Sequence, residues 1–164
     1  VSACAKAGKR LPTNEEWYLA ALGTPDVSRA WSASHCNVAS NWQSAQPGFT
    51  GTAQECVSYY GAYDMIGNVW EWVNDTVKDG QYEGIDVPDS GFVTGVDEAG
   101  FPITTASSSD PNHNDDRFWS NDSEVMGIFR GGFWASKSEG GIYSIYAQMP
   151  PSFVGVGVGF RCVK

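Results

Sequence analysis

The spacing of apolar and polar positions predicts one well-marked helix near the start of the chain. Thr13 and Glu16 form a Thr-x-x-Glu capping box, which satisfies backbone donors at a helix N-terminus. Beyond the box, the apolar positions fall on one helical face and comprise Trp17, Ala20 and Ala21. Gly23 and Pro25 then predict the end of this helix.

A second helical segment is expected at the very beginning. Residues 2–7 have the composition of the last turns of a helix, and Gly8 can supply a left-handed cap after them. Because Val1 is no initiator and the chain opens inside this segment, we expect that upstream sequence has been cut away.

After residue 25 the pattern changes from helical to extended. Short runs rich in aromatic and β-branched residues predict strands at 67–73, 128–134, 142–147 and 158–163. No internal repeat is present at any useful period. The pattern favours a loop-rich α+β fold with short antiparallel strands and two helices.

Composition narrows the class of protein further. The 164 residues are 41% hydrophobic and include 19 glycines, which suits a single compact domain with many loops. The net charge of −9 disfavours binding to nucleic acid or to anionic membrane surfaces, both of which need a basic patch. No apolar stretch approaches the roughly 20 residues that a membrane span requires, so we expect no direct membrane insertion.

Charge is concentrated in one part of the chain. Twelve of the 19 acidic residues lie in residues 75–124, a segment that we call the acidic insert and predict to be a solvated surface excursion. A metal site at its adjacent residues His113, Asp115 and Asp116 is not favoured, because no rigid element is marked there. Residues 133–159 contain just two charges, Lys137 and Glu139, among Tyr, Ser, Gly and Phe, a composition typical of an adaptable binding surface.

The four cysteines show no Cys-x-x-Cys pair, which argues against zinc and thioredoxin-like chemistry. Disulfides are the leading interpretation. Four buried thiols in a reducing cytosol are the alternative. The cysteines are Cys4, Cys36, Cys56 and Cys162.

Three separated motifs carry a family resemblance. They are residues 8–17 (GKRLPTNEEW), 63–72 (YDMIGNVWEW) and 130–134 (RGGFW), the last continuing to 159–162 (GFRC). In this order they resemble the formylglycine-generating-enzyme (sulfatase-modifying factor) branch of the C-type lectin fold, which implies one such domain over residues 1–164. In the enzymes of that branch a reactive cysteine pair follows the Arg-Gly-Gly motif, whereas this chain has Ser136 and Gly141. The comparison therefore implies a retained scaffold that is no enzyme and has no redox cofactor.

The same resemblance implies two disulfides. The cysteine before the first motif pairs with that of Gly-Phe-Arg-Cys in the related enzymes, which gives Cys4–Cys162 and leaves Cys36 to pair with Cys56. Disulfides of this kind imply an extracellular, cell-surface or virion-associated protein.

The middle motif implies a structural calcium ion. Asp64, Gly67, Val69 and Glu71 correspond to positions at which the related enzymes bind Ca²⁺ through two side chains and two carbonyls. In the alternative interpretation Asp64 caps the turn and Glu71 pairs with a basic residue. Both interpretations stay open at this point.

Residues 130–162 also resemble the variable region of diversity-generating-retroelement variable proteins, in which selected codons are rewritten while a lectin-like backbone stays constant. Framework positions match at Gly131, Gly132, Trp134, Gly141, Ile142, Tyr143, Pro151, Ser152, Val158, Gly159 and Phe160. The implied variable, ligand-binding positions are Phe133, Ala135, Ser136, Glu139, Tyr146, Gln148, Met149, Phe153, Gly155 and Gly157. Gln148 and Met149 do not derive from the asparagine codons that such templates favour, so they need other adenine-containing codons or a different boundary of the set.

This resemblance implies a hypervariable, receptor- or adhesin-like protein that binds a macromolecular target, with the ten positions on one exposed face. A formylglycine-generating-enzyme-like domain without its cysteine pair, acting as an altered enzyme or a structural surface domain, is the alternative. An ordinary lectin-like domain without programmed variation is a further one.

Overall fold

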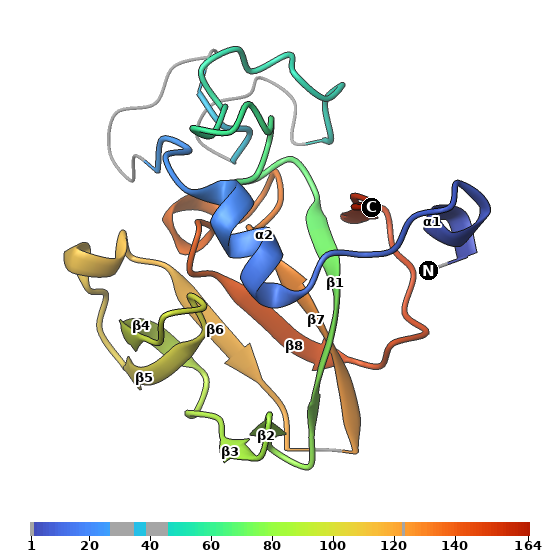
Figure 1. Cartoon of the computed structure of the whole chain (residues 1–164). Coiled ribbons are helices and arrows are strands. Elements are labelled where there is room, and N and C mark those ends of the chain that lie inside the picture. Colours follow the sequence, from blue (N-terminus) through green and yellow to red (C-terminus); the bar gives the residue numbers. More distant parts are fainter. Residues whose placement is uncertain (1, 27–34, 39–45, 123) are drawn as a thin grey trace.

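In the computed structural model, which describes residues 2–26, 35–38, 46–122 and 124–164, two α-helices precede a curled sheet (Figure 1). The predicted helices are confirmed as α1 (Ser2–Lys6) and α2 (Asn14–Ala21). Both bonds of the capping box are present, since Thr13 Oγ1 accepts from the Glu16 amide and Glu16 accepts from the Thr13 amide. Gly8 has a φ of +67°, the left-handed conformation expected after α1.

The sheet contains nine strands in the order β3-β2-β1-β7-β8-β6-β4-β5, with β9 paired to β1. Its pairings are antiparallel except β1 with β9 and β6 with β8. The strands are β1 (Trp70–Lys78), β2 (Gln81–Tyr82), β3 (Ile85–Asp86), β4 (Gly91–Val96), β5 (Pro102–Ala106), β6 (Arg117–Ser120), β7 (Val125–Arg130), β8 (Ile145–Met149) and β9 (Val158–Phe160). Two 3₁₀ turns, η1 (Pro111–His113) and η2 (Lys137–Glu139), complete the described elements. A loop-rich α+β fold was therefore predicted correctly.

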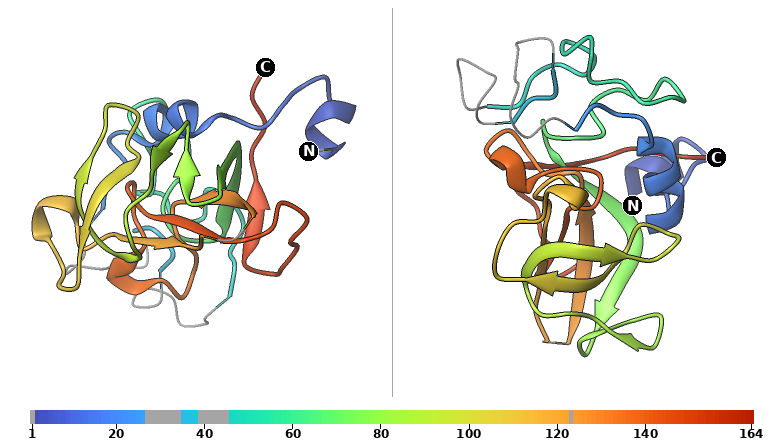
Figure 2. Two further views of the ribbon diagram at one scale, coloured as in Figure 1. Left: turned by 90° about the horizontal axis from the view of Figure 1, so that it is seen from below. Right: turned by 90° about the vertical axis from the view of Figure 1, so that its left-hand side faces the viewer.

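Helix α2 covers one face of the sheet, and the main core lies between them (Figures 1 and 2). Trp17 and Ala21 of α2 are fully buried against Ile128 and Ile145 of the central strands. Arg130 is also fully buried, with its guanidinium 4.9 Å from the Trp17 ring. Its two terminal nitrogens donate to the carbonyls of Gly100 and Ile142. Burial lowers the pKa of Arg130 to about 10.

The predicted strand boundaries need correction, and backbone conformation gives the reason. The run at 128–134 ends at Arg130, because Gly131 and Gly132 have φ of +87° and +84° and turn the chain. The run at 142–147 starts three residues late, at Ile145, because side-chain carboxylates take the amides of Ile142 and Tyr143. Similarly, the strand expected at 67–73 runs over residues 70–78, and the one expected at 158–163 ends at 160.

The acidic insert is more than the solvated excursion predicted for it. It supplies β2 to β6, and Val93 and Phe118 from these strands are fully buried in the core. Asp116 is also fully buried. Alternation along short strands places one side chain in two inward, so even a charged segment contributes to a core once it pairs with the sheet.

Both predicted disulfides are present. Cys4–Cys162 has a Cα–Cα distance of 5.6 Å and Cys36–Cys56 one of 4.7 Å, so the alternative of four thiols is wrong. The first bridge ties together the two ends of the chain, which lie on the same side of the molecule (Figure 2). Two disulfides are consistent with an oxidising compartment such as the extracellular space. Among the described residues, we find no helix with the length and apolar character of a membrane span.

Candidate ligand-binding face

A cluster of aromatic rings lies on the face of the sheet opposite the main core. Ile128 and Ile145 point toward α2, so their neighbours Phe129 and Tyr146 point the other way. The Tyr146 ring lies 6.1 Å from Phe129, 5.8 Å from Trp70 and 5.9 Å from Trp119. We call this cluster, made of Trp70, Trp119, Phe129, Phe133 and Tyr146, the aromatic face; Phe129 and Trp70 are buried in it and the other three rings are partly exposed.

Two loops, residues 131–144 and 150–157, bring further rings to the aromatic face. Phe133 stacks on Trp70 at 6.4 Å between ring centroids, with an interplanar angle of 21°. Phe153 packs edge-on against Phe129 at 6.1 Å. Gly157 accepts a hydrogen bond from the Trp70 amide and lies so close to Phe133 that a Cβ there would be 3.2 Å from its ring. Three predicted variable positions therefore converge on one surface.

A β-bulge brings Met149 to the same side. Strand alternation alone would place Tyr146 and Met149 on opposite faces, because three positions separate them. Phe129 pairs with Tyr146 and Gly127 with Met149, so two residues of β7 face three of β8. Since directly paired residues share a face, the extra residue turns Met149 toward the aromatic face.

The polar members of the predicted set reach β6 of the acidic insert. Arg117 donates to Glu139 at 3.3 Å and lies 5.6 Å from the Trp119 ring. Gln148 donates to the Ser120 carbonyl at 2.9 Å. Glu139 and Gln148 therefore connect the final segment to the insert at one edge of the aromatic face.

The ten predicted variable positions differ in exposure, and Ser136 contradicts the prediction of an exposed face. Ala135 and Gly155 are exposed and the other seven are partly exposed. Ser136 is buried at 8%, because its hydroxyl accepts from the Phe133 amide and its side chain packs between Gly132 and Gly140. Ser136 thus supports the loop from inside, and its exposure was predicted wrongly.

Sequence reasoning missed several residues of this region. Trp70 and Trp119 were not among the predicted positions, although both contact Tyr146. Val154 and Val156 are each 87% exposed in the loop that carries Phe153. The apolar composition of this loop is a signal that could have pointed to it as a contact surface.

The face continues into a groove on the far side of Phe129. Trp72 lies 3.9 Å from Phe129 between ring centroids, and Trp72 and Phe153 both line a groove of about 350 Å³. Leu11, Val154 and Phe160 also line it. A largely apolar groove beside an aromatic surface suits contact with a protein or another large ligand.

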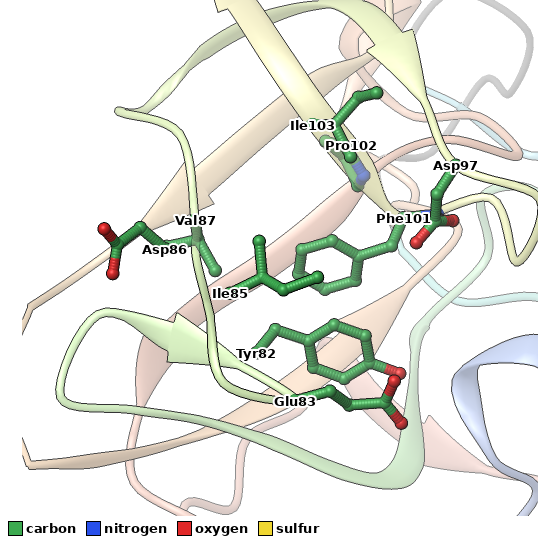
Figure 3. Close-up of a pocket in the computed structure, with 9 residues that line it drawn as sticks. All are labelled: Tyr82, Glu83, Ile85, Asp86, Val87, Asp97, Phe101, Pro102 and Ile103. Carbon is green, nitrogen blue, oxygen red and sulfur yellow. The ribbon is translucent and has the colours of Figure 1, made fainter.

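A separate pocket of about 90 Å³ lies in the acidic insert, away from the predicted variable positions (Figure 3). Tyr82 and Phe101 stack at its base, 4.1 Å apart and nearly parallel. Carboxylates of Glu83 and Asp97 lie around it, and burial together with nearby acids, Asp75 first among them, raises the pKa of Tyr82.

The middle motif has the contacts of the alternative interpretation. Arg161 donates to both oxygens of Glu71, at 2.6 and 2.5 Å, and the Trp17 indole donates to one of them at 2.6 Å. Asp64 accepts from the Gly51 amide at 2.7 Å, and burial raises its pKa. A cation bound by Asp64, Gly67, Val69 and Glu71 would have to share Glu71 with a guanidinium, so the expected ligand set does not fit Ca²⁺ as it stands. Calcium binding stays a prediction.

No group of three or more His, Cys, Asp or Glu side chains suited to a metal ion occurs in the described part of the chain. At the positions of the reactive cysteine pair, Ser136 offers a buried hydroxyl and Gly141 a Cα flanked by Asp116 and Asp26. Neither position can form a thiolate.

Comparisons with known proteins agree with this architecture. Residues 1–164 match the family described as sulfatase-modifying factor enzyme 1-like domain. The formylglycine-generating enzyme of Thermomonospora curvata is 40% identical over 87 residues, which are 42% of this chain and 28% of the enzyme. The chain therefore matches less than a third of that relative's length.

Two solved structures have the same fold at low identity. Treponema denticola variable protein 1 is 22% identical, with 94% of this chain and 46% of that chain covered and a TM-score of 0.56. Major Tropism Determinant U1 Variant is 17% identical, with 98% and 35% covered and a TM-score of 0.58. The fold is the C-type lectin-like fold of the formylglycine-generating-enzyme type, as the motifs predicted.

Proposed function

This chain belongs to the sulfatase-modifying factor enzyme 1-like domain family, and from that premise we propose that it is a hypervariable ligand-binding protein. Its final segment, residues 130–162, would carry the diversified positions on a constant lectin-like scaffold. The observation that carries the proposal is that Phe133, Tyr146, Met149 and Phe153 converge on one surface.

The burial of positions in the segment gives the proposal partial support. Four of the eleven matched framework residues are buried, namely Gly131, Gly132, Gly141 and Ile142, and Pro151, Ser152 and Phe160 are exposed, whereas one of the ten predicted variable positions is buried. Solvent-facing positions can change without disturbing a core, which is what a diversified surface requires. Two proteins with this fold are Treponema denticola variable protein 1 and the U1 variant of the Major Tropism Determinant.

We propose a macromolecular target, reached outside the cytosol. Aromatic side chains dominate binding energy at protein interfaces, and the aromatic face and groove together offer an extended contact surface. The net charge of −9 disfavours nucleic acid as the target.

Sequencing of this locus from many members of one population tests the proposal, with a search nearby for a near-repeat of residues 130–162 and a reverse-transcriptase frame. Substitutions should concentrate at the ten positions while residues 2–26 serve as the internal control. Evenly spread substitutions, with no such repeat, would show an ordinary lectin-like domain.

An altered enzyme is the second candidate, favoured by the identity of 40% to a formylglycine-generating enzyme. We propose that the chain lacks that activity because Ser136 and Gly141 stand where thiolates are needed. A cysteine-containing sulfatase peptide should stay unmodified with this protein while the Thermomonospora curvata enzyme converts it. Formation of formylglycine would contradict the binding-protein proposal.

A further inference from the structure

Two carboxylates meet beneath the loop that carries the first predicted variable positions. Asp26 follows α2, and Asp116 immediately precedes β6. Asp116 accepts a hydrogen bond from the Tyr143 amide at 2.7 Å, and Asp26 accepts from the Ile142 amide at 3.3 Å. The pair therefore holds two successive amides at the point where the loop returns to β8.

Gly141 shows how close the two carboxylates are. A Cβ on Gly141 would overlap both Asp116 Oδ1 and Asp26 Oδ2, at 2.1 and 2.2 Å, so these two oxygens lie within about 4.3 Å of each other. Asp116 is fully buried, and its Oδ1 has no hydrogen-bond partner within the described residues. A buried oxygen without a donor is costly, and two ionised carboxylates this close repel each other.

Among the described residues, the charges around the pair do not balance two ionised carboxylates. The cation that acts on Asp116 in this part of the chain is Arg130, and its terminal nitrogens already donate to the carbonyls of Gly100 and Ile142. Burial, reinforced by Asp26, raises the pKa of Asp116 well above its usual value, and the Tyr143 amide, Ser144 hydroxyl and Arg130 offset this in part. Burial likewise raises the pKa of Asp26 to about 7.

Other titratable groups surround the pair. Asp115 adds negative charge beside Asp26, and Tyr143 brings a phenol. Next to Tyr143 lie the phenol of Tyr18 in α2 and the imidazole of His113 in η1. Asp110 is hydrogen-bonded to His113. Arg130 is in turn influenced by Tyr82, Tyr18 and Asp97.

We propose that Asp26 and Asp116 share one proton, and that this carboxyl–carboxylate hydrogen bond holds the base of the loop 133–144 beneath the aromatic face. The shared proton gives Asp116 Oδ1 its missing donor and removes one negative charge from the interior. The one carboxylate charge that remains is balanced by the positive charge of Arg130. The pair itself is independent of the proposed function, whereas its use as an unchanging base for a diversified loop rests on that function.

The pair makes stability depend on pH in a defined direction. A carboxyl pKa that is higher in the folded state means that the folded protein binds the proton more tightly than the unfolded chain. The resulting stability is fully present below about pH 4 and is lost as pH rises toward and through about 7. We expect the folded-to-unfolded ratio to fall on the order of a hundredfold between pH 5 and pH 8.

The substitution Asp116→Asn tests the proposal because an amide supplies the hydrogen permanently. Its oxygen can still accept from the Tyr143 amide, while its nitrogen takes the place of Oδ1 and donates to Asp26 Oδ2. Urea unfolding at pH 5 and pH 8 should show little pH dependence for this variant. The exposed Asp89→Asn is the matched control and should retain the wild-type dependence. His113→Gln should retain it too, which separates the pair from the nearby imidazole. An unchanged pH dependence in Asp116→Asn would overturn the proposal.

A measurement on the wild-type protein covers the case in which the variant fails to fold. Carboxyl ¹³C resonances followed from pH 4 to pH 9 should show one of the two carboxyls still protonated at pH 6. Both ionised at pH 6 would refute the shared proton. Stabilisation of the wild-type protein at pH 8 by added CaCl₂, absent in Asp116→Asn, would show a cation site in its place. None of these results bears on the population test of variability, so failure of one proposal is distinguishable from failure of the other.

Discussion

The pair Arg161–Glu71 allows a quantitative prediction about what holds the middle motif in place. Glu71 is 7% exposed and accepts from Arg161 at both oxygens, while its remaining partner is the Trp17 indole. The substitution Arg161→Met removes the positive charge but keeps an apolar stem of similar length. It leaves a buried carboxylate with one neutral donor. We expect a loss of about 3 kcal/mol in the free energy of unfolding, the lower end for a broken buried pair.

Urea unfolding at pH 7 measures this loss, and the melting temperature should fall by about 6–12 °C for a domain of this size. The double variant Glu71→Gln with Arg161→Met should recover most of the stability, because a neutral amide no longer needs a counter-ion and still accepts from Trp17. Arg10→Met is the matched control. It breaks the pair Arg10–Glu16, whose distance is also 2.6 Å but whose side chains are 49% and 39% exposed. Solvent screening should make its effect a small fraction of the other. Equal losses in Arg161→Met and Arg10→Met, or a double variant as unstable as the single one, would refute this reasoning.

Three further predictions concern binding, covalent structure and metal. Tyr146→Ser should weaken binding to the target about thirtyfold, by surface plasmon resonance, while circular dichroism shows a folded protein, because Tyr146 is the centre of the aromatic face; unchanged affinity would move the binding site elsewhere. Replacing Cys4 and Cys162 by serine should lower the free energy of unfolding by about 5 kcal/mol, and replacing Cys36 and Cys56 by about 3 kcal/mol, because the bridges span 158 and 20 residues; the reverse order in denaturant titrations would contradict the chain-entropy argument. Calcium between Asp64 and Glu71 predicts that a chelator lowers the melting temperature in calorimetry; no change would leave Arg161 as the cation that serves Glu71.

The accuracy of the sequence-based predictions follows from the range of the interactions involved. The capping box of α2 and the left-handed Gly8 were predicted correctly because both depend on contacts within a few residues. The disulfide pairing came from motifs shared with a family, since spacing alone leaves three connectivities for four cysteines. Strand ends were predicted poorly, because amides of residues 142 and 143 bind carboxylates from distant parts of the chain.

The candidate site divides in the same way. Sequence by itself indicated a segment with the composition of an adaptable surface, and the family resemblance added Phe133, Tyr146 and Phe153 as predicted positions, because composition and framework matches are local properties. Tertiary structure decided that Ser136 is buried, that a bulge turns Met149 to the face of Tyr146, and that Trp70 and Trp119 join that face. These outcomes depend on strand register and on contacts between segments far apart in the chain. Hydrophobic periodicity contains neither, because it records which side of a strand is apolar and not which strand lies beside it.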